Sequence, residues 1–248
     1  MSTDGRIMST FTLPSDGKVY EEEINPEVTL ASMKTKHEIM RLSATGDNYK
    51  ILADIIDDCI QNDIGISAYD LCIGDFQYLL YSLRVVTYGE EYSIYTRCPI
   101  CGAENKIDVN LTELDINEYN ESLVDLLTFD LPVSDHSITL TLQTPRLLDK
   151  ISRLNKADQR KHKGDNSFLY MITNSIIEVD GEPANPIVIE KLISELPMKD
   201  TATILNRIKK VNDFIGVQTQ LDDICGKCGQ SYTTPFRIQG DFFRPTNF

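Results

Sequence analysis

The 248-residue sequence has few positive charges and few histidines, and it contains no long apolar run. The absence of 18 consecutive apolar residues argues against a transmembrane helix, and residues 1–6 lack the apolar stretch of a signal peptide. We therefore expect a protein of the cytosol. Lys and Arg number 24 against 38 Asp and Glu, for a net charge of -14, which argues against a broad nucleic-acid-binding surface. Any macromolecular partner is expected to be a protein.

The sequence also lacks the patterns of common catalytic and phosphate-binding sites. It contains neither G-x-G-x-x-G nor G-x4-G-K-[ST], and no H-E-x-x-H. The three histidines have no metal-ligand or triad-like spacing with their neighbours, so we expect them on the surface or in loops: His37, His136 and His162. The basic run of residues 156–163 fits a solvated helix end and loop better than a nucleic-acid contact. We expect no enzymatic activity.

Two short cysteine motifs, far apart in the chain, are the strongest positive signal. They are Cys98-Pro99-Ile100-Cys101-Gly102 and Cys225-Gly226-Lys227-Cys228-Gly229. The C-x2-C spacing lets both thiolates of one tight turn reach one metal ion, and glycine after the second cysteine suits a left-handed backbone. Together the motifs predict one tetrahedral site with four thiolate ligands: Cys98, Cys101, Cys225 and Cys228. Such a site has no open position for water or substrate, and it indicates a structural zinc ion.

Other readings of the cysteines carry less weight. An iron site of the rubredoxin type uses the same four ligands and remains an alternative to zinc. Redox catalysis is disfavoured, because a thioredoxin-like C-x-x-C is expected at the start of a helix, whereas each motif here lies between two predicted strands. The remaining two cysteines, Cys59 and Cys72, lie among apolar residues and are predicted to be small buried side chains.

Residues 1–87 are predicted to form an N-terminal domain of one hairpin followed by helices. The hairpin strands are predicted at residues 11–13 and 19–20, joined by the turn Pro14-Ser15-Asp16-Gly17. Apolar residues at helical spacing predict helices over residues 28–42 and 49–62, and a third helix after Asp75.

Alternating residues on both sides of each cysteine motif predict a zinc ribbon that is split between two parts of the chain. Residues 88–112 carry its first half, with strands at 91–97 and 106–111. Residues 222–248 carry the second half and the C-terminal tail, with strands predicted at 217–224 and 231–238. We expect the two halves to pair into one β unit around the metal. Apart from the duplicated cysteine motif, no internal repeat is evident.

Residues 113–221, between the two halves, are too many for a loop and predict an inserted, largely helical subdomain. An acidic stretch, residues 112–125, leads to a hairpin predicted at 128–133 and 137–144. Helices are predicted at about 145–157, 166–178, 185–196 and 199–214. The fold class is therefore α+β, with an N-terminal hairpin and helices, a split zinc-ribbon β unit and this insertion.

Two segments are candidate surfaces for a partner. One is the acidic stretch of residues 112–125. The other is the C-terminal tail, in which Phe242-Phe243-Arg244-Pro245 and Phe248 place aromatic side chains at an end that usually frays. The tail either packs back on its own domain or docks on a partner as an aromatic interface anchor.

The order of these elements resembles the T-even-type phage baseplate protein family. The resemblance covers nearly the whole chain and is most specific at about residues 70–115 and from the closing Cys-x2-Cys through Phe-Phe-Arg-Pro. It rests on Thr-Leu-Pro-Ser-Asp-Gly-Lys (residues 12–18), Asp-Phe-Gln-Tyr-Leu-Leu-Tyr-Ser-Leu-Arg (75–84), Tyr-Thr-Arg-Cys-Pro-Ile-Cys-Gly (95–102) and Asn-Leu-Thr-Glu-Leu (110–114). Members of this family are contractile-tail phage proteins described as baseplate hub assembly proteins or chaperones.

The resemblance implies a protein that helps to build the baseplate hub, either as a transient chaperone or as a subunit that remains. Its partners would be other hub or tail proteins, with no small-molecule substrate, nucleic acid or membrane. Its location would be the host cytoplasm during phage assembly, or the virion. The rival interpretation is a zinc-ribbon nucleic-acid-binding or transcription regulatory protein, against which the ribbon segments carry more acidic than basic residues.

Overall fold

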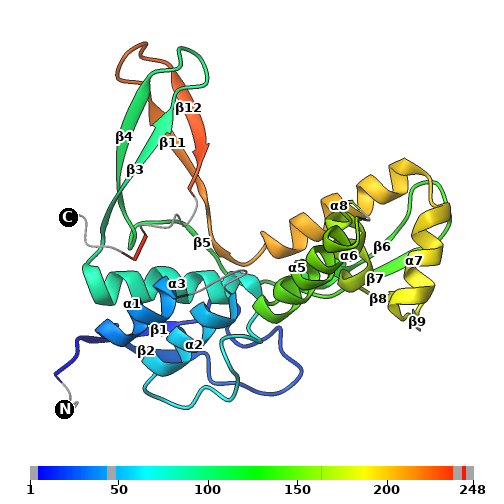
Figure 1. Ribbon diagram of the computed structural model, residues 1–248, viewed down its shortest axis with the longest axis horizontal. Helices are drawn as coiled ribbons and strands as arrows, with labels where there is room; N and C mark the ends of the chain where they lie inside the picture. Colours follow the sequence, from blue (N-terminus) through cyan, green and yellow to red (C-terminus); the bar gives the residue numbers. More distant parts are fainter. Residues whose placement is uncertain (1–4, 44–48, 163, 237–241, 244–248) are drawn as a thin grey trace.

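The computed structural model of the chain describes residues 5–43, 49–162, 164–236 and 242–243. Helices and small antiparallel sheets divide among three parts: an N-terminal body, an inserted body, and a ribbon that stands away from both (Figure 1). The α+β class expected from the sequence is confirmed. None of the helices in the described part of the chain is long and apolar enough to span a bilayer.

The N-terminal body packs helices against one hairpin. Its elements are β1 (Met8–Thr12), β2 (Glu27–Ala31), α1 (Thr35–Leu42), α2 (Tyr49–Cys59) and α3 (Ile73–Tyr88). Helix α3 is buried on most of its surface, because it lies between the hairpin and the base of the ribbon. The core includes fully buried side chains from three elements: Leu30, Ile56, Phe76, Leu79 and Leu83.

The predicted N-terminal hairpin exists, but its second strand was assigned to the wrong residues. Residues 19–20 lie in the long connection after β1, and the partner strand is β2. The helix predicted over residues 28–42 begins only at Thr35. The reason is visible in the burial: Val28 and Leu30 are buried while Thr29 between them is half-exposed, which is the period of a strand and not of a helix.

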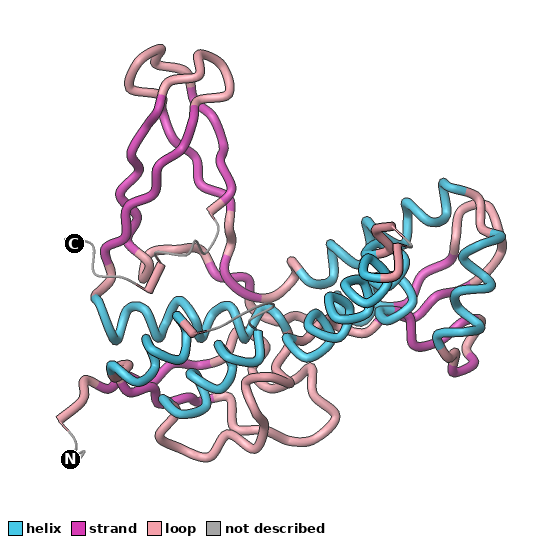
Figure 2. Tube along the Cα trace, viewed as in Figure 1, coloured by secondary structure: helices cyan, strands magenta, loops and turns pink. Residues whose placement is uncertain are grey.

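The ribbon consists of two hairpins. The first is β3 (Glu91–Arg97) with β4 (Glu104–Asn110), and the second is β11 (Gln220–Ile224) with β12 (Ser231–Pro235). We expected one paired β unit, whereas the structure has two separate two-stranded sheets that converge at their cysteine turns (Figure 2). The ribbon is fixed to α3 by Arg84, whose guanidinium donates to the carbonyl oxygens of Gly89 (2.9 Å) and Glu91 (3.2 Å).

The inserted body combines helices with a four-stranded antiparallel sheet of order β6-β7-β8-β9. Its strands are β6 (Thr128–Asp130), β7 (Ser137–Leu140), β8 (Ile176–Val179) and β9 (Glu182–Pro183). Its helices are α4 (Ser122–Leu127), α5 (Pro145–Arg160), α6 (Ser167–Ser175), α7 (Pro186–Glu195) and α8 (Met198–Asn212). The hairpin predicted at residues 128–144 is confirmed. The helix predicted to residue 178 instead ends at Ser175, because the β-branched Ile176 and Ile177 continue as a strand.

The two bodies meet where α3 begins. Strand β10 (Gly216–Val217), which pairs with β5 (Ile116–Asn117), passes so close to α3 that no Cβ fits between them. A Cβ on Gly74 would lie 2.2 Å from the carbonyl oxygen of Ile215, and Gly216 adopts a φ of +108° that only glycine takes readily. The ion pair between Arg146 and Asp70 also spans this junction.

The described part of the C-terminal tail packs on its own protein. Phe236, Phe242 and Phe243 are buried, and the Phe242 ring centroid lies 5.3 Å from that of Tyr81 in α3 and 5.2 Å from that of Tyr92 in β3. Of the two alternatives for the tail, packing on its own domain is therefore the one that Phe242 and Phe243 follow. Arg244, Pro245 and Phe248 lie outside the described residues, as does the predicted end of the last strand at residue 238.

The junction predicts a strong effect of a single methyl group. Gly74→Ala should destabilise the protein by about 3 kcal/mol, because the new Cβ would overlap the backbone at Ile215 and force α3 away from β10. Denaturant unfolding measures this loss. Gly226→Ala is the matched control: its Cβ would have Asn105 as its nearest neighbour at 3.8 Å, so stability should be nearly unchanged. Equal stability of the two variants would contradict the close approach.

Candidate metal centre

Each cysteine turn has the same local structure. In the first turn the N–H of Gly102 donates to the carbonyl of Cys98 (2.9 Å), and in the second the N–H of Gly229 donates to the carbonyl of Cys225 (2.8 Å). Both glycines have a φ of +71°, the left-handed backbone expected at this position. The strands on either side hold each turn, since β4 and β12 each begin two residues after the glycine.

The structure brings the four predicted cysteines together. The Sγ atoms of Cys98 and Cys228 lie 3.8 Å apart, those of Cys101 and Cys225 lie 3.6 Å apart, and all four sulfurs are within 4.8 Å of one another. Zn–S bonds of about 2.3 Å at the tetrahedral angle place sulfurs about 3.8 Å apart. The cluster is therefore compatible with a metal such as zinc. The separations far exceed a disulfide bond of about 2 Å, and the cysteines are free thiols.

The electrostatics of the thiols favour a cation between them. Backbone N–H groups of Cys228 and Lys227 lower the pKa of Cys225 to about 6. The backbone N–H of Gln230 acts in the same direction on Cys228, but burial and the neighbouring thiols outweigh it and raise the pKa of Cys228 to about 11. The thiols of Cys225 and Cys228 therefore resist joint ionisation. A divalent cation reverses that resistance, because it stabilises all the thiolates at once.

Polar contacts join the two hairpins around the sulfurs. The hydroxyl oxygens of Thr96 in β3 and Tyr232 in β12 lie 2.8 Å apart, and the Tyr232 hydroxyl donates to Asp223 at 2.8 Å. On the other side, the N–H of Gly226 donates to Oδ1 of Asn105 at 3.0 Å. Cys98 and Cys225 are buried, while Cys101 and Cys228 are exposed. A metal ion bound by these four thiolates would have all its coordination positions filled by protein. It could stabilise the two hairpins against each other but would offer no position to a substrate.

Sequence reasoning missed a second group of polar residues. His37 was expected at the surface, but it is fully buried, with Nε2 2.8 Å from a carboxylate oxygen of Asp58. Its Nδ1 accepts from the N–H of Lys34 at 3.0 Å and lies 3.5 Å from Sγ of Cys59. Nothing in the local spacing signals this group, because its members come from two helices. Burial raises the pKa of Cys59 to about 11, so the thiol stays protonated, as the buried side chain predicted for it would be.

The other singled-out residues lie outside the metal centre. Cys72 is buried, as predicted. His136 is half-buried in the turn before β7, and His162 is exposed just after α5. The basic run ends α5 and continues into a turn, which agrees with a solvated helix end; Lys163 lies outside the described residues.

Fold and site together define an α+β protein in which two distant hairpins present a four-cysteine centre. The family model of the T4 bacteriophage base plate protein matches residues 7–244 of this chain. The chain therefore belongs to the T4 bacteriophage base plate protein family, and the resemblance seen in the sequence is confirmed. Neither the curated proteins nor the solved structures contain a match. Membership implies interactions with other phage tail or baseplate proteins, in the virion or during its assembly.

The metal centre predicts a linked loss of metal and stability. Cys98→Ser should abolish tight zinc binding and lower the thermal midpoint, because three thiolates remain on a ribbon with little core of its own. Elemental analysis and thermal unfolding of the purified variant measure both effects. Cys59→Ala serves as control: it creates a small core defect but should keep the metal content of the native chain. Native metal content and stability in Cys98→Ser would refute a structural metal.

Proposed function

We propose that this chain acts without enzymatic activity in assembling the baseplate hub of a contractile tail, as a chaperone that leaves or as a subunit that stays. The observation that carries the proposal is the family match, which extends over nearly the whole chain. A protein that works by binding other proteins needs defined surfaces and no reactive centre. The filled four-cysteine arrangement suits that need.

The role we assign to the metal is structural, with zinc as the ion and iron as the alternative. Among the described residues, the cysteine end of the ribbon has only a very small core, formed by Cys98, Cys225 and Tyr232, whereas Tyr92 and Val109 at its base belong to the core of the N-terminal body. Two-stranded hairpins of this kind are marginal in water. A structural zinc site contributes on the order of 10 kcal/mol of apparent binding free energy, comparable with the stability of a whole domain. The metal would therefore supply the rigidity that the ribbon lacks.

The acidic surface supports a role in handling another protein. The net charge is -14, and the stretch of residues 112–125 keeps its acidic side chains exposed: Glu113, Asp115, Glu118, Glu121 and Asp125. Such a surface can shield a basic or aggregation-prone face of a hub component before assembly, and it steers association electrostatically.

The test is an affinity pull-down of the tagged full-length protein from phage-infected cells. Mass spectrometry should identify baseplate hub or tail proteins among the bound material. A parallel analysis of purified virions separates the two forms of the proposal, because only a retained subunit is present in mature particles. A matched pull-down with Cys98→Ser shows whether binding depends on the intact metal centre.

Two outcomes would overturn the proposal. One is the absence of every hub and tail component from the bound fraction. The other is recovery of polymerase or nucleic acid alone, with salt-dependent binding, which would support the zinc-ribbon regulatory protein instead.

A further inference from the structure

The two bodies begin with hairpins of the same sequence pattern and the same register. Thr-Phe-x-Leu-Pro occurs at residues 10–14 and again at 128–132. In β1–β2 the paired residues are Thr10 with Thr29, Phe11 with Val28 and Thr12 with Glu27. In β6–β7 they are Thr128 with Thr139, Phe129 with Ile138 and Asp130 with Ser137. The threonine hydroxyls face each other across both hairpins, at 2.9 Å and 3.2 Å.

The elements that follow each hairpin also correspond. Leu30 of β2 bridges to Ile60, the residue directly after α2, and Leu140 of β7 pairs with Ile176, the residue directly after α6. The spacing from each of these leucines to the first residue of the next helix is identical, at Thr35 for α1 and Pro145 for α5. Strand, helix, helix and returning strand segment therefore recur in the same order.

A buried aspartate fixes each hairpin to a long helix in the same way. Asp75 is the third residue of α3 and accepts hydrogen bonds from the N–H (2.9 Å) and hydroxyl (2.5 Å) of Ser15. Asp200 is the third residue of α8 and accepts from the N–H (3.0 Å) and hydroxyl (2.7 Å) of Ser134. Both carboxylates are fully buried. Ser15 directly follows the Leu-Pro of its hairpin, whereas Ser134 stands one residue further on, after Val133, whose N–H also donates to Asp200 at 3.0 Å.

The long helices and the cysteine hairpins complete the correspondence. Apolar residues stand at the same four positions after each aspartate: Leu79, Leu80, Leu83 and Val86 in α3, and Ile204, Leu205, Ile208 and Val211 in α8. Each long helix leads to one C-x2-C hairpin. The structure therefore contains one module twice, over residues 8–110 and 128–235, and the sequence-based expectation of no repeat beyond the cysteine motif was wrong. The second copy adds β9 and α7.

The two copies differ in what covers the ribbon-facing side of the long helix. On α3, this side is closed by the segment after β12: Phe236 and Phe242 are fully buried, with ring centroids 5.5 Å and 5.3 Å from that of Tyr81. On α8, the corresponding segment is the one after β4, which reaches the helix through residues 116–120. It brings no phenylalanine to that position.

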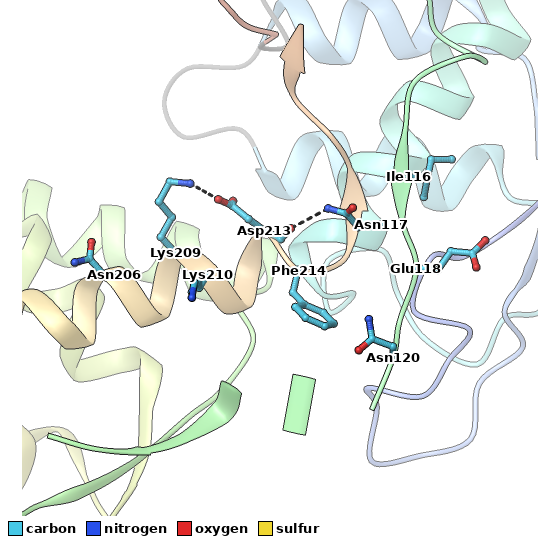
Figure 3. A pocket seen from close by; sticks show the side chains of 9 residues that line it. All are labelled: Ile116, Asn117, Glu118, Asn120, Asn206, Lys209, Lys210, Asp213 and Phe214. Atoms are coloured by element: carbon cyan, nitrogen blue, oxygen red, sulfur yellow. Dashed lines mark hydrogen bonds and ion pairs between the residues drawn. The ribbon is translucent and has the colours of Figure 1, made fainter. Parts of the chain in front are cut away.

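A cavity of about 890 Å³ lies beside the end of α8, at the position that Phe236 and Phe242 fill beside α3 (Figure 3). One wall is formed by Asn206, Lys209, Lys210, Asp213 and Phe214. Counted from the buried aspartate, these are the positions that in α3 hold Tyr81, Arg84, Val85, Tyr88 and Gly89. The opposite wall is formed by Ile116 and its neighbours up to Asn120. What is a filled aromatic site in the first copy is thus open in the second.

We infer that this open α8 site is a docking site for an extended segment of a partner protein that carries an acidic residue next to an aromatic one. The filled copy defines the aromatic part of that chemistry, because Phe242 packs on Tyr81 of α3, and Lys210 in the cavity wall defines the acidic part. An aromatic ring would pack against Phe214 and Ile116 in the cavity. This inference depends neither on the metal nor on the role in hub assembly.

The charges in the cavity fit such a segment. Lys209 pairs with Asp213, as Figure 3 shows, while Lys210 has no ion-pair partner among the residues that the structure describes. An incoming carboxylate would pair with Lys210, and either ammonium group can also lie over an aromatic ring. Amide side chains of Asn120 and Asn206 on the two walls suit hydrogen bonding to an extended backbone.

The probe is a dye-labelled synthetic peptide with the sequence of residues 234–243, titrated with the full-length protein and followed by fluorescence anisotropy. Saturable binding is expected, and Lys210→Glu should weaken it at least tenfold. Lys199→Glu is the matched control, since it makes the same charge change at an exposed position of α8 outside the cavity and should leave binding unchanged. A second peptide with alanine in place of both terminal phenylalanines should not bind.

Asn206→Tyr is an independent test in which the affinity for the peptide should rise instead of fall. It gives α8 the ring that α3 has at this position, so the peptide should bind several-fold more tightly, while Ala202→Tyr on the exposed side should change nothing. Absence of saturable binding overturns the docking site. So does binding that is indifferent to Lys210→Glu, since the peptide would then be bound elsewhere, for example on α3.

Discussion

The convergence of four sulfur atoms from two hairpins is the constraint on which the ribbon depends. Each hairpin has only two strands. Tyr92, Ile94 and Val109 join the core of the N-terminal body at the base of the ribbon, but around the cysteine turns the described residues form only a very small core. Two-stranded hairpins are marginal in water on their own. At this end of the ribbon the hairpins meet through the sulfur atoms, which lie less than 4 Å apart in pairs across the hairpins and are compatible with a bound metal ion. Contacts such as Gly226 with Asn105 then fix the orientation of one hairpin relative to the other.

The position of the ribbon relative to the helices rests on a different interaction. Arg84, buried in α3, binds the backbone at Gly89 and Glu91, where the chain leaves the helix and enters β3. Phe236 and Phe242 cover the same helix from the other end of the chain. The N-terminal body is therefore completed by residues from the C-terminus. The four-cysteine cluster joins the hairpin that follows α3 to the hairpin that precedes this C-terminal segment, so it lies between the two ends of the described chain.

The duplicated module explains why the two cysteine motifs are alike. Each motif belongs to one copy, so the four-cysteine cluster contains two cysteines from each copy and neither copy forms it alone. The copies differ where they meet other parts of the protein. The first has an aromatic face that the tail covers, and the second has a polar, lysine-bearing face that remains open. The covered face of α3 serves internal packing, whereas the open face of α8 is the one we infer to bind a partner.

Much of the fold followed from local patterns in the sequence. The C-x2-C-G turns, the strands beside them and helices such as α5 and α7 have signals within a few residues: ligand spacing, period-two alternation, and Pro after a capping residue. The position of β2 was missed because a short run such as Val28 to Ala31 fits either period until its burial is known. The strand predicted at residues 19–20 was wrong, because the turn signal at Pro14 to Gly17 does not determine the length of the connection before the partner strand begins.

The sequence by itself determined which four cysteines form one cluster and the α+β class, because both depend on residue type and short spacing. Only the tertiary structure decided that His37 meets Asp58 and Cys59 in the interior, and that the halves of the ribbon are separate sheets. It also revealed the second copy of the module, of which the sequence carries only short traces such as the repeated Thr-Phe-x-Leu-Pro. The physical reason is that Asp75 and Asp200 act on serines more than 50 residues away, and a contact between residues so far apart leaves no periodic trace along the chain.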